Sequence, residues 1–454
     1  MPQMSEQLEL PFQSRGEASA EKRSAEASTT TTGNERPGAS GPEETLFELA
    51  LERKNLQAAL KRVRKNKGSP GVDGMTVDDL STHLIAHWKE IREQLLAGTY
   101  QPQPVRRHVI PKSGGGERQL GIPTVLDRLI QQALLQVLQP RLDPGFSKHS
   151  HGFRPGRSAH GAVREARAYV QEGRRWVVDV DLEKFFDTVD HDVLMGRLAK
   201  RVTDRRVLAL VRKYLTAGIL AAGVLSQHDV GTPQGGPLSP LLANVLLDEV
   251  DKELERRKHA FVRYADDCNV YVRSERAGVR VMALLRRLFT RLHLRVNESK
   301  SAVALVWKRK FLGFSFWKRS EQVRVRVATQ AIDRLSDRVR ELTKRSRGVS
   351  LGTVCEDLRV LLAGWKNYFQ LAECRSVFED LDKWIRRRIR AFRLRQWRTA
   401  RKTFTELRRL GLSPTRARQG AAYAGRWWRA SDQAVHFALT NHRIDELGVP
   451  RLAA

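Results

Sequence analysis

Two segments rich in β-branched and aromatic residues end in carboxylates, and they constrain the fold of this chain most. Residues 261–272 predict two strands that meet at Asp266 and Asp267. Residues 176–181 predict an apolar strand that ends in Asp181. An Asp-Asp turn alone is usually a solvated turn, but a third carboxylate on another strand favours a cation, because like charges repel unless something neutralises them. The sequence therefore predicts a metal site at Asp181, Asp266 and Asp267.

Asp179 is the chief competitor of Asp181. It lies two residues earlier and so faces the same side of the strand. We favour Asp181 because Phe185 then falls where a side chain that discriminates between sugars is needed. Carboxylates from two strands can hold two Mg²⁺ ions roughly 4 Å apart, which would activate a primer 3′-hydroxyl and stabilise a leaving pyrophosphate.

The charge balance predicts a polyanionic partner. The 454 residues include 81 Lys and Arg against 51 Asp and Glu, a net charge of +30, and the pI is near 10.7. Such a field attracts nucleic acid with a steep dependence on salt. The three cysteines have no paired spacing, and we see no secretory signal, membrane anchor or apolar run near the ~20 residues of a membrane span. We expect a soluble, intracellular, nucleic-acid-binding protein without a membrane partner.

The chain changes character along its length. Residues 1–42 have the composition of a disordered tail. Residues 43–328 alternate between helical and strand patterns, with a helix expected at 44–65, a strand at 106–110 and a helix at 124–138, which predicts an α+β fold. Beyond residue 330 helical patterns dominate, and residues 331–454 hold 27 Lys and Arg against 13 Asp and Glu, a net +14.

One segment of this basic region is exceptional. Residues 383–402 contain ten basic residues and no acidic ones, while apolar residues recur at helical intervals. An amphipathic helix with a solvated face is the simpler interpretation. Mutual repulsion among ten cations favours a phosphate-facing surface instead. On that interpretation the RNA-binding residues are Arg386, Arg387, Arg388 and Arg390.

Two glycine-rich loops are candidates for contact with a nucleotide. Residues 231–240 precede an apolar helix, and closely spaced glycines let a nucleotide or template base approach the backbone. Lys112 and Arg118 bracket the other loop, and their cations can close over a triphosphate. A structural loop entering a helix and an exposed charged hairpin remain the alternatives.

The order of these segments resembles the reverse transcriptases encoded by group II introns, which are also maturases. The resemblance spans roughly residues 45–440. It rests on residues 67–74 and 114–127 as fingers motifs, 151–158 as the insertion that sets this family apart from retroviral enzymes, 181–186, 231–240 and 264–267 as palm motifs, 297–300 and 311–314 as the last polymerase motifs, and 362–369 as the core of the thumb.

The resemblance implies a right-hand polymerase. Fingers and palm would occupy residues 43–328, an all-helical thumb or maturase domain 329–410, and a basic extension that is a candidate for DNA binding 411–454. Asp181, Asp266 and Asp267 would be the catalytic triad that holds two Mg²⁺ ions. Lys112 and Arg118 would contact the triphosphate, Phe185 would exclude a ribose 2′-hydroxyl and Gln234 would lie near the nascent base pair. Lys300 would assist pyrophosphate departure, with a solvated helix-end lysine as the equal alternative.

The resemblance also implies partners and a cellular role. The chain would bind its group II intron RNA, assist splicing as a maturase, and copy the RNA from a DNA primer with dNTPs during retrohoming into target DNA. It would lack the HNH endonuclease of some relatives and act in the bacterial cytoplasm, at the nucleoid when bound to DNA; homodimerisation stays open. The alternatives are a maturase with little polymerase activity, another prokaryotic reverse transcriptase (retron, diversity-generating or phage-defence type) and a structural RNA chaperone.

Overall fold

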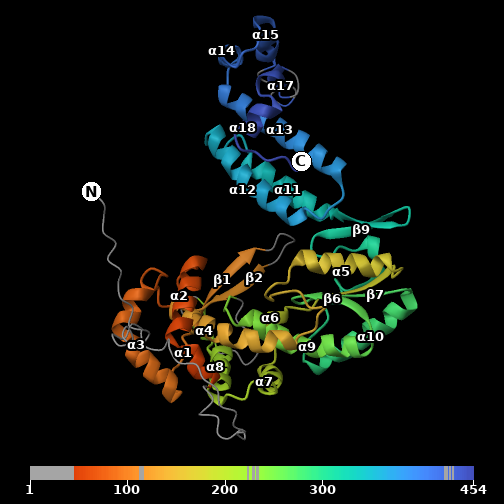
Figure 1. Ribbon diagram of the computed structural model, residues 1–454. Coiled ribbons are helices and arrows are strands. Elements are labelled where there is room, and N and C mark those ends of the chain that lie inside the picture. Colours follow the sequence, from red (N-terminus) through yellow and green to blue (C-terminus); the bar gives the residue numbers. More distant parts are fainter. Residues whose placement is uncertain are drawn as a thin grey trace, which may run out of the picture. The chain divides into compact units, whose positions relative to one another are not determined.

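The computed structural model describes residues 45–111, 117–221, 224–226, 231, 235–423, 428, 431 and 434–453 (Figure 1). The predicted tail, Lys112 and Gln234 lie outside these ranges. The chain divides into two compact units. Unit 1 runs up to Ala162 and resumes over Val178–Val303, whereas unit 2 comprises Val163–Val177 and Ala304–Ala454. The predicted boundary between residues 328 and 329 lies within unit 2.

The sheet that carries the predicted carboxylates has four strands in the order β6-β7-β3-β8. Buried valines such as Val178, Val262 and Val270 make its strands apolar, as the sequence predicts. Gly278 brings helix α10 close to the sheet, since a Cβ atom there would lie 2.4 Å from Val303 Cγ1. The strands are β3 (Trp176–Val180), β6 (Ala260–Tyr264), β7 (Asp267–Val272) and β8 (Ala302–Leu305), and the neighbouring long helices are α9 (Ser239–Arg256) and α10 (Glu275–Arg291).

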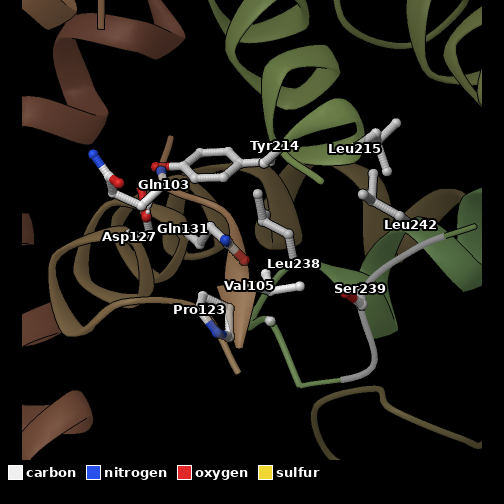
Figure 2. A pocket seen from close by; sticks show the side chains of 12 residues that line it. Gln103, Val105, Pro123, Asp127, Gln131, Tyr214, Leu215, Leu238, Ser239 and Leu242 are labelled. Atoms are coloured by element: carbon white, nitrogen blue, oxygen red, sulfur yellow. Dashed lines mark hydrogen bonds between the residues drawn. The ribbon is translucent and has the colours of Figure 1, made fainter. Parts of the chain in front are cut away.

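A second four-stranded sheet has the order β2-β1-β4-β5. The predicted strand at 106–110 is part of β1, and the predicted helix at 124–138 is part of α4. Helix α4 begins near the sheet at a buried carboxylate, Asp127, which accepts hydrogen bonds from Tyr100 Oη (2.8 Å) and Thr124 Oγ1 (2.7 Å). Burial raises the pKa of Asp127. Figure 2 shows this residue beside Tyr214 at a small cavity of about 20 Å³. The elements are β1 (Val105–Pro111), β2 (Glu117–Ile122), β4 (Ile219–Ala221), β5 (Val224–Ser226) and α4 (Val125–Leu142).

The predicted helix at 44–65 is two helices. Thr45 caps the first with a reciprocal capping box to Glu48, and Glu52 breaks the run with an extended backbone (ψ 143°). The remaining helices of unit 1 pack their apolar faces inward. The bounds are α1 (Leu46–Leu51), α2 (Arg53–Asn66), α3 (Leu80–Ala97), α6 (Phe185–Thr188), α7 (His191–Ala199) and α8 (Arg205–Thr216), with a 3₁₀ turn at Asp143–Gly145.

Unit 2 joins a hairpin to a helical array. Beyond Val327 the described residues form helices and no strand, which agrees with the predicted change of character. The predicted continuous helix at 383–402 ends at Trp397 because Arg398 has a left-handed backbone (φ 60°, ψ −55°). The elements are α5 (Ala159–Gln171, mostly in this unit), β9 (Phe314–Arg319), β10 (Gln322–Val327), α11 (Thr329–Leu342), α12 (Leu351–Phe369), α13 (Arg375–Trp397), α14 (Ala400–Arg409), α15 (Pro414–Ala422), α17 (Ala434–Ala438) and α18 (Asn441–Glu446), with a 3₁₀ turn at Val306–Lys308.

The α+β class and the helical C-terminal part are confirmed. None of the helices in the described ranges combines the length and the apolar character that a bilayer span requires.

Candidate active site

The Asp-Asp pair lies at the tip of a tight hairpin. Strands β6 and β7 pair antiparallel up to Tyr264 opposite Asp267, which leaves only Ala265 and Asp266 to make the turn. Ala265 has a positive φ of 58°, as two-residue hairpin turns require. Asp267 is the first residue of β7, so the two carboxylates emerge at the turn where the sequence predicts them.

Asp181 is fixed at the end of β3, the strand that neighbours β7 in the sheet. The segment that follows residue 296 anchors it through the backbone. Asn297 N–H donates to the Asp181 carbonyl at 2.9 Å, and Asp181 N–H donates to Ser301 Oγ at 3.0 Å. Ser301 therefore holds the backbone of Asp181 in place. The two residues are 120 positions apart in the sequence, so no local pattern suggested this contact.

The carboxylates influence one another. Burial and the negative charges of Asp266, Asp179 and Asp181 raise the pKa of Asp267 to about 7, while Lys300 acts in the opposite direction. Asp267 also reaches solvent, so a cation can approach it from outside. Crowded oxygen donors of one charge sign, open to solvent, suit a hard divalent cation.

Lys300 lies at this cluster. Its Nζ is 3.5 Å from Asp181 Oδ1, and the lysine side chain is 62% exposed. Asp179 has a different neighbour. In the amide orientation that satisfies both groups, the buried Asn269 donates from Nδ2 to Asp179 Oδ1 at 2.9 Å. This hydrogen bond engages Asp179 within the sheet, which favours Asp181 as the carboxylate presented to a metal.

Within the described part of the chain, no three His, Cys, Asp or Glu side chains are already arranged as a metal-binding group. The fit with Mg²⁺ therefore rests on the chemistry of the donors and on their mutual repulsion. Asp181, Asp266 and Asp267 are the residues that would hold the ion.

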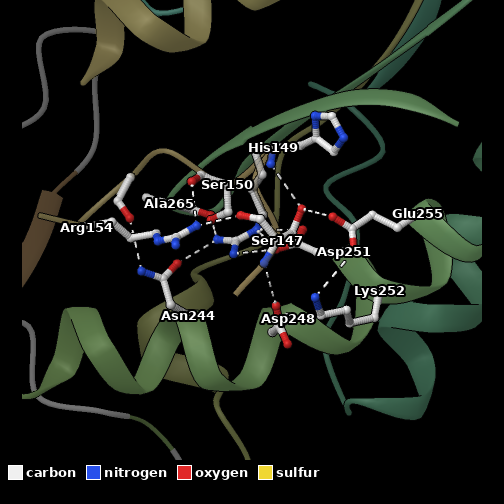
Figure 3. Close-up of polar contacts among 12 residues, drawn as sticks. Ser147, His149, Ser150, Arg154, Asn244, Asp248, Asp251, Lys252, Glu255 and Ala265 are labelled. Atoms are coloured by element: carbon white, nitrogen blue, oxygen red, sulfur yellow. Dashed lines mark hydrogen bonds and ion pairs between the residues drawn. The ribbon is translucent and has the colours of Figure 1, made fainter. Parts of the chain in front are cut away.

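A buried polar strut supports the turn, and Figure 3 labels two of its members, Asn244 and Asp251, together with Ala265 of the turn. Arg263, only 1% exposed, forms a two-pronged ion pair with Asp251 (Nη2–Oδ2, 2.6 Å) and donates from Nη1 to Ala265 O at 2.8 Å and to Asn244 Oδ1 at 2.9 Å. Burial works against charge on Arg263, but the facing Asp251 more than offsets it and raises the pKa of the guanidinium. We define the buried strut as Arg263, Asp251 and Asn244.

The strut connects the turn to the segment at residues 147–154. Asn244 Nδ2 donates to Gly152 O at 3.0 Å, and the backbone of Arg263 pairs with His149 O and His151 N–H. A Cβ atom on Gly152 would lie 2.1 Å from Ala265 N, so only glycine allows this approach. The predicted motif at 151–158 is thus packed directly against the Asp-Asp turn.

The predicted nucleotide contacts are only partly described. Lys112 and Gln234 lie outside the described residues. Arg118 belongs to β2, where it pairs with Ile110, and its side chain is not described. Gly235 has φ 137°, and a Cβ atom there would lie 2.7 Å from Gly121 O, so Gly235 packs closely against β2.

The position expected for Phe185 is wrong. Phe185 is 3% exposed, so it is a core residue rather than one that faces a nucleotide, and both Phe185 and Phe186 line a small space with Leu242. Phe186 is only partly buried and stacks edge-on against it, with ring centroids 5.0 Å apart. Adjacent aromatic residues at the start of a short helix cannot be assigned to core or surface from their order alone.

The predicted surface of four arginines in unit 2 is wrong for two of them. Arg386 is 2% exposed and pairs with Asp382 (3.2 Å) and Asp445 (2.7 Å). Arg390 is 3% exposed and donates to Leu439 O at 2.7 Å. Burying an unpaired charge is costly, and both buried guanidiniums accordingly donate to acceptors within unit 2.

The other two arginines are partly exposed but engaged. Arg387 lies 4.3 Å from the ring centroid of Trp428 and donates to its carbonyl. Arg388 donates to Thr343 Oγ1 at 2.6 Å. The middle of α13 therefore holds unit 2 together, and Asp382, four residues before Arg386, was the available sign of this.

The chain matches two family models. Residues 110–316 match the reverse transcriptase (RNA-dependent DNA polymerase) family, and residues 332–411 match the group II intron, maturase-specific domain. The first match contains Asp181, Asp266, Asp267 and Lys300. The second contains α13 and α14.

Relatives of known sequence agree with these matches. Protein YkfC of Escherichia coli is 39% identical over 218 residues, which cover 47% of this chain and 57% of that protein. The group II intron-encoded protein LtrA of Lactococcus lactis is 39% identical over 221 residues, covering 48% and 36%. An uncharacterized 91 kDa protein in the cob intron of Schizosaccharomyces pombe is 35% identical over 216 residues, covering 47% and 26%. The matched region spans between about a quarter and somewhat more than half of these relatives.

Proposed function

We propose that this chain, a member of the group II intron-encoded reverse transcriptases with a maturase domain, copies RNA into DNA at Asp181, Asp266 and Asp267. The observation that carries the proposal is the gathering of Asp266, Asp267 and Asp181 at one end of the sheet, where burial and the neighbouring carboxylates together raise the pKa of Asp267 to about 7. Crowding of this kind is costly to a folded protein unless a cation relieves it. The cluster lies within the segment that matches reverse transcriptases.

Each residue of the site has a distinct task. Asp181 and Asp266 present oxygens from two neighbouring strands, and Asp267 completes the negative field. Two Mg²⁺ ions bound there would lower the barrier by activating the primer 3′-hydroxyl and neutralising the leaving pyrophosphate. Lys300, 3.5 Å from Asp181, holds a positive charge and a proton where the pyrophosphate departs. Lys112, Arg118 and Gln234 remain our candidates for contact with the dNTP and the nascent pair.

A primer-extension assay tests this function. Purified protein with an RNA template, an annealed DNA primer, dNTPs and Mg²⁺ should make cDNA, and chelation of the metal should stop synthesis. Ca²⁺ in place of Mg²⁺ is the control, since its looser coordination suits the geometry of transfer poorly. A protein that binds the template-primer but never extends it would favour the maturase without polymerase activity, and equal extension without a divalent metal would exclude the proposed chemistry.

We assign the discrimination of sugars to Phe186 instead of Phe185. Phe186→Ala should raise incorporation of rNTPs relative to dNTPs by about tenfold or more, because an aromatic side chain near the 2′-position excludes a hydroxyl by contact. Phe185→Ala is the matched control. It should leave sugar selectivity unchanged while destabilising unit 1 by about 3–5 kcal/mol, the usual cost of emptying a core phenylalanine site. Misincorporation kinetics and thermal unfolding of both variants measure this, and altered selectivity in Phe185→Ala alone would contradict the assignment.

We extend the proposal to the wider role of the protein. The maturase-specific match and the net charge of +30 support binding of a group II intron RNA and help with its splicing. Retrohoming into target DNA, a dimeric state and action in the cytoplasm or at the nucleoid follow from the same family membership. A structured intron RNA encoded around the gene, with splicing that depends on the protein, is the expected finding; splicing at the same rate without the protein would contradict the maturase role.

A further inference from the structure

We infer that a basic cleft in unit 2, at the junction of α13 and α14, is a binding site for an unpaired, looped-out segment of RNA. The inference deepens the proposed maturase function and rests on it. The cleft has a volume of about 840 Å³. Its basic lining residues are Arg345, Arg393, Arg395, Arg398 and Lys402, and its one acidic lining residue among those described is Glu406.

The cations of the cleft are presented to solvent. Arg345, Arg395, Arg398 and Lys402 are exposed, in contrast to Arg386 and Arg390 on the same stretch of sequence. Arg345 and Arg395 line the same cleft, and burial and the positive charge of Arg395 lower the pKa of Arg345. An arrangement of like charges in a hollow is stabilised by an anion that bridges them.

Two helix N-termini add to this field. Ser350 caps α12 by accepting from Thr353 N–H at 3.1 Å, and Thr399 caps α14 by accepting from Lys402 N–H at 3.2 Å. Ser350 and Lys402 both line the cleft. The first turn of a helix carries a partial positive charge and suits phosphate. The C-terminus of α13 and the carboxylate of Glu406 oppose this effect, but five cations and two N-termini outweigh them.

The walls of the cleft are rigid. Gln396 Nε2 donates to Val349 O at 2.9 Å, which ties the end of α13 to the loop between α11 and α12. At the corner, Thr399 N–H donates to Trp397 O at 2.7 Å around Arg398, whose φ of 60° makes this a strained γ-turn. The indole Nε1 of the buried Trp397, another lining residue, finds no acceptor among the described residues. The walls of the cleft are thus held in place by internal hydrogen bonds, and they present hydrogen-bond donors to a ligand.

The size of the cleft favours an unpaired strand. A volume of this order accommodates a ligand the size of a small molecule, which corresponds to roughly one or two nucleotides and excludes the body of a duplex. Proteins recognise RNA mainly at loops and bulges, where arginines contact phosphates and stack on bases. All the lining residues, from Arg345 to Glu406, lie in the segment that matches the maturase-specific domain, which favours RNA over single-stranded DNA.

The double variant Arg395→Gln/Arg398→Gln of the full chain tests the inference. Its affinity for an RNA hairpin with an unpaired loop should fall about a hundredfold, roughly tenfold for each guanidinium removed. The slope of log affinity against log salt should fall by about two. Glu406→Gln should act in the opposite direction and tighten binding severalfold. The melting temperature should be unchanged in each variant, because the altered side chains are exposed or half-buried.

The matched control is Arg375→Gln/Lys383→Gln, which removes the same amount of charge from α13 outside the cleft, at side chains that are 83% and 75% exposed. Affinity for the hairpin should fall less than about threefold in this control. An equal fall in both double variants would overturn the inference, since overall charge would then explain the binding. A selective loss of binding to a DNA duplex or to a DNA loop of the same sequence would also overturn it.

Primer extension on the same preparations separates this inference from the proposed function. Cleft variants that extend a primer on an unstructured template at the normal rate, yet bind the hairpin weakly, support a separate RNA site. If the wild-type protein makes cDNA and all variants bind the hairpin equally well, the assignment of RNA binding to the cleft would be overturned. The proposed function would remain intact.

Discussion

Asp266→Ala should abolish cDNA synthesis, lowering the rate by at least about a thousandfold, while the protein remains folded and still binds RNA. The expectation follows from the position of Asp266 in a two-residue turn beside Asp267. Loss of a ligand removes several kcal/mol of stabilisation from the charge that develops on the transferred phosphoryl group. Single-turnover primer extension on an RNA template measures the loss.

The same substitution should not destabilise the protein. Asp266 raises the pKa of Asp267 by repulsion, so its removal relieves strain that the folded state carries without metal. The melting temperature in the absence of Mg²⁺ should therefore be equal to or higher than that of the wild type.

Glu183→Gln is the matched control for the companion variant Asp181→Asn, because Glu183 is an exposed acid two residues away. We expect full synthesis in the first and none in the second. Undiminished synthesis in Asp181→Asn or Asp266→Ala would refute the site. Loss of RNA binding along with synthesis would show that the substitution had affected more than the metal.

Replacing Arg263 should strongly destabilise unit 1. Arg263→Met leaves Asp251 buried at 0% exposure without its cation, and such a change costs about 3–5 kcal/mol. The double variant Arg263→Met/Asp251→Leu should recover most of this loss, since apolar residues can replace a buried ion pair at little cost.

In that double variant the stability should recover but the catalytic rate should not. Ala265 O and Asn244 Oδ1 still lose the donor that holds the Asp-Asp turn, so kcat should stay about ten- to a hundredfold low, as misplaced catalytic groups often cause. The KM for dNTP should change little, because Arg263 is a positioning residue and lies beneath the turn.

Arg201→Met/Asp248→Leu provides the comparison. Arg201 forms another ion pair with Asp248 of α9, which is buried, but neither residue is bonded to the turn. Because Asp248→Leu also removes the acceptor of the Ser147 N–H (3.1 Å), this variant should lose stability, but without a matching loss of kcat. Full recovery of kcat in the Arg263/Asp251 double variant would contradict the positioning role.

The sequence predicted the features whose causes are local. The strand ending in Asp181 and the hairpin around Asp266 follow from runs of apolar residues and a two-residue turn, and the structure contains both. The helix expected at 44–65 was wrong in its continuity, since Glu52 breaks it by its backbone conformation rather than by its side chain.

Features that depend on distant contacts were not predicted. Ser301 supports Asp181 from 120 positions away, and the tie between Asn244 and Gly152 spans 92 positions. Arg386 and Arg390 look like surface cations in the sequence because their internal acceptors, such as Asp445 and the carbonyl of Leu439, come from the last part of the chain. Net charge predicts a basic surface but does not say which arginines form it.

The division of the chain between its units has a consequence for synthesis on the ribosome. Residues 163–177 belong to unit 2, yet the rest of that unit begins only at Ala304. At the usual rate of elongation, the α5 residues of this segment would wait roughly ten seconds before the rest of unit 2 begins to be synthesised, whereas Trp176 and Val177 belong to β3, whose neighbour β7 is made earlier. A nascent chain stopped near residue 303 therefore lacks the Val323 backbone to which Arg167 and Gln171 of α5 are hydrogen-bonded, and we expect a chaperone to bind it more strongly than the finished chain. The same interleaving means that no single cut in the chain separates unit 1 from unit 2.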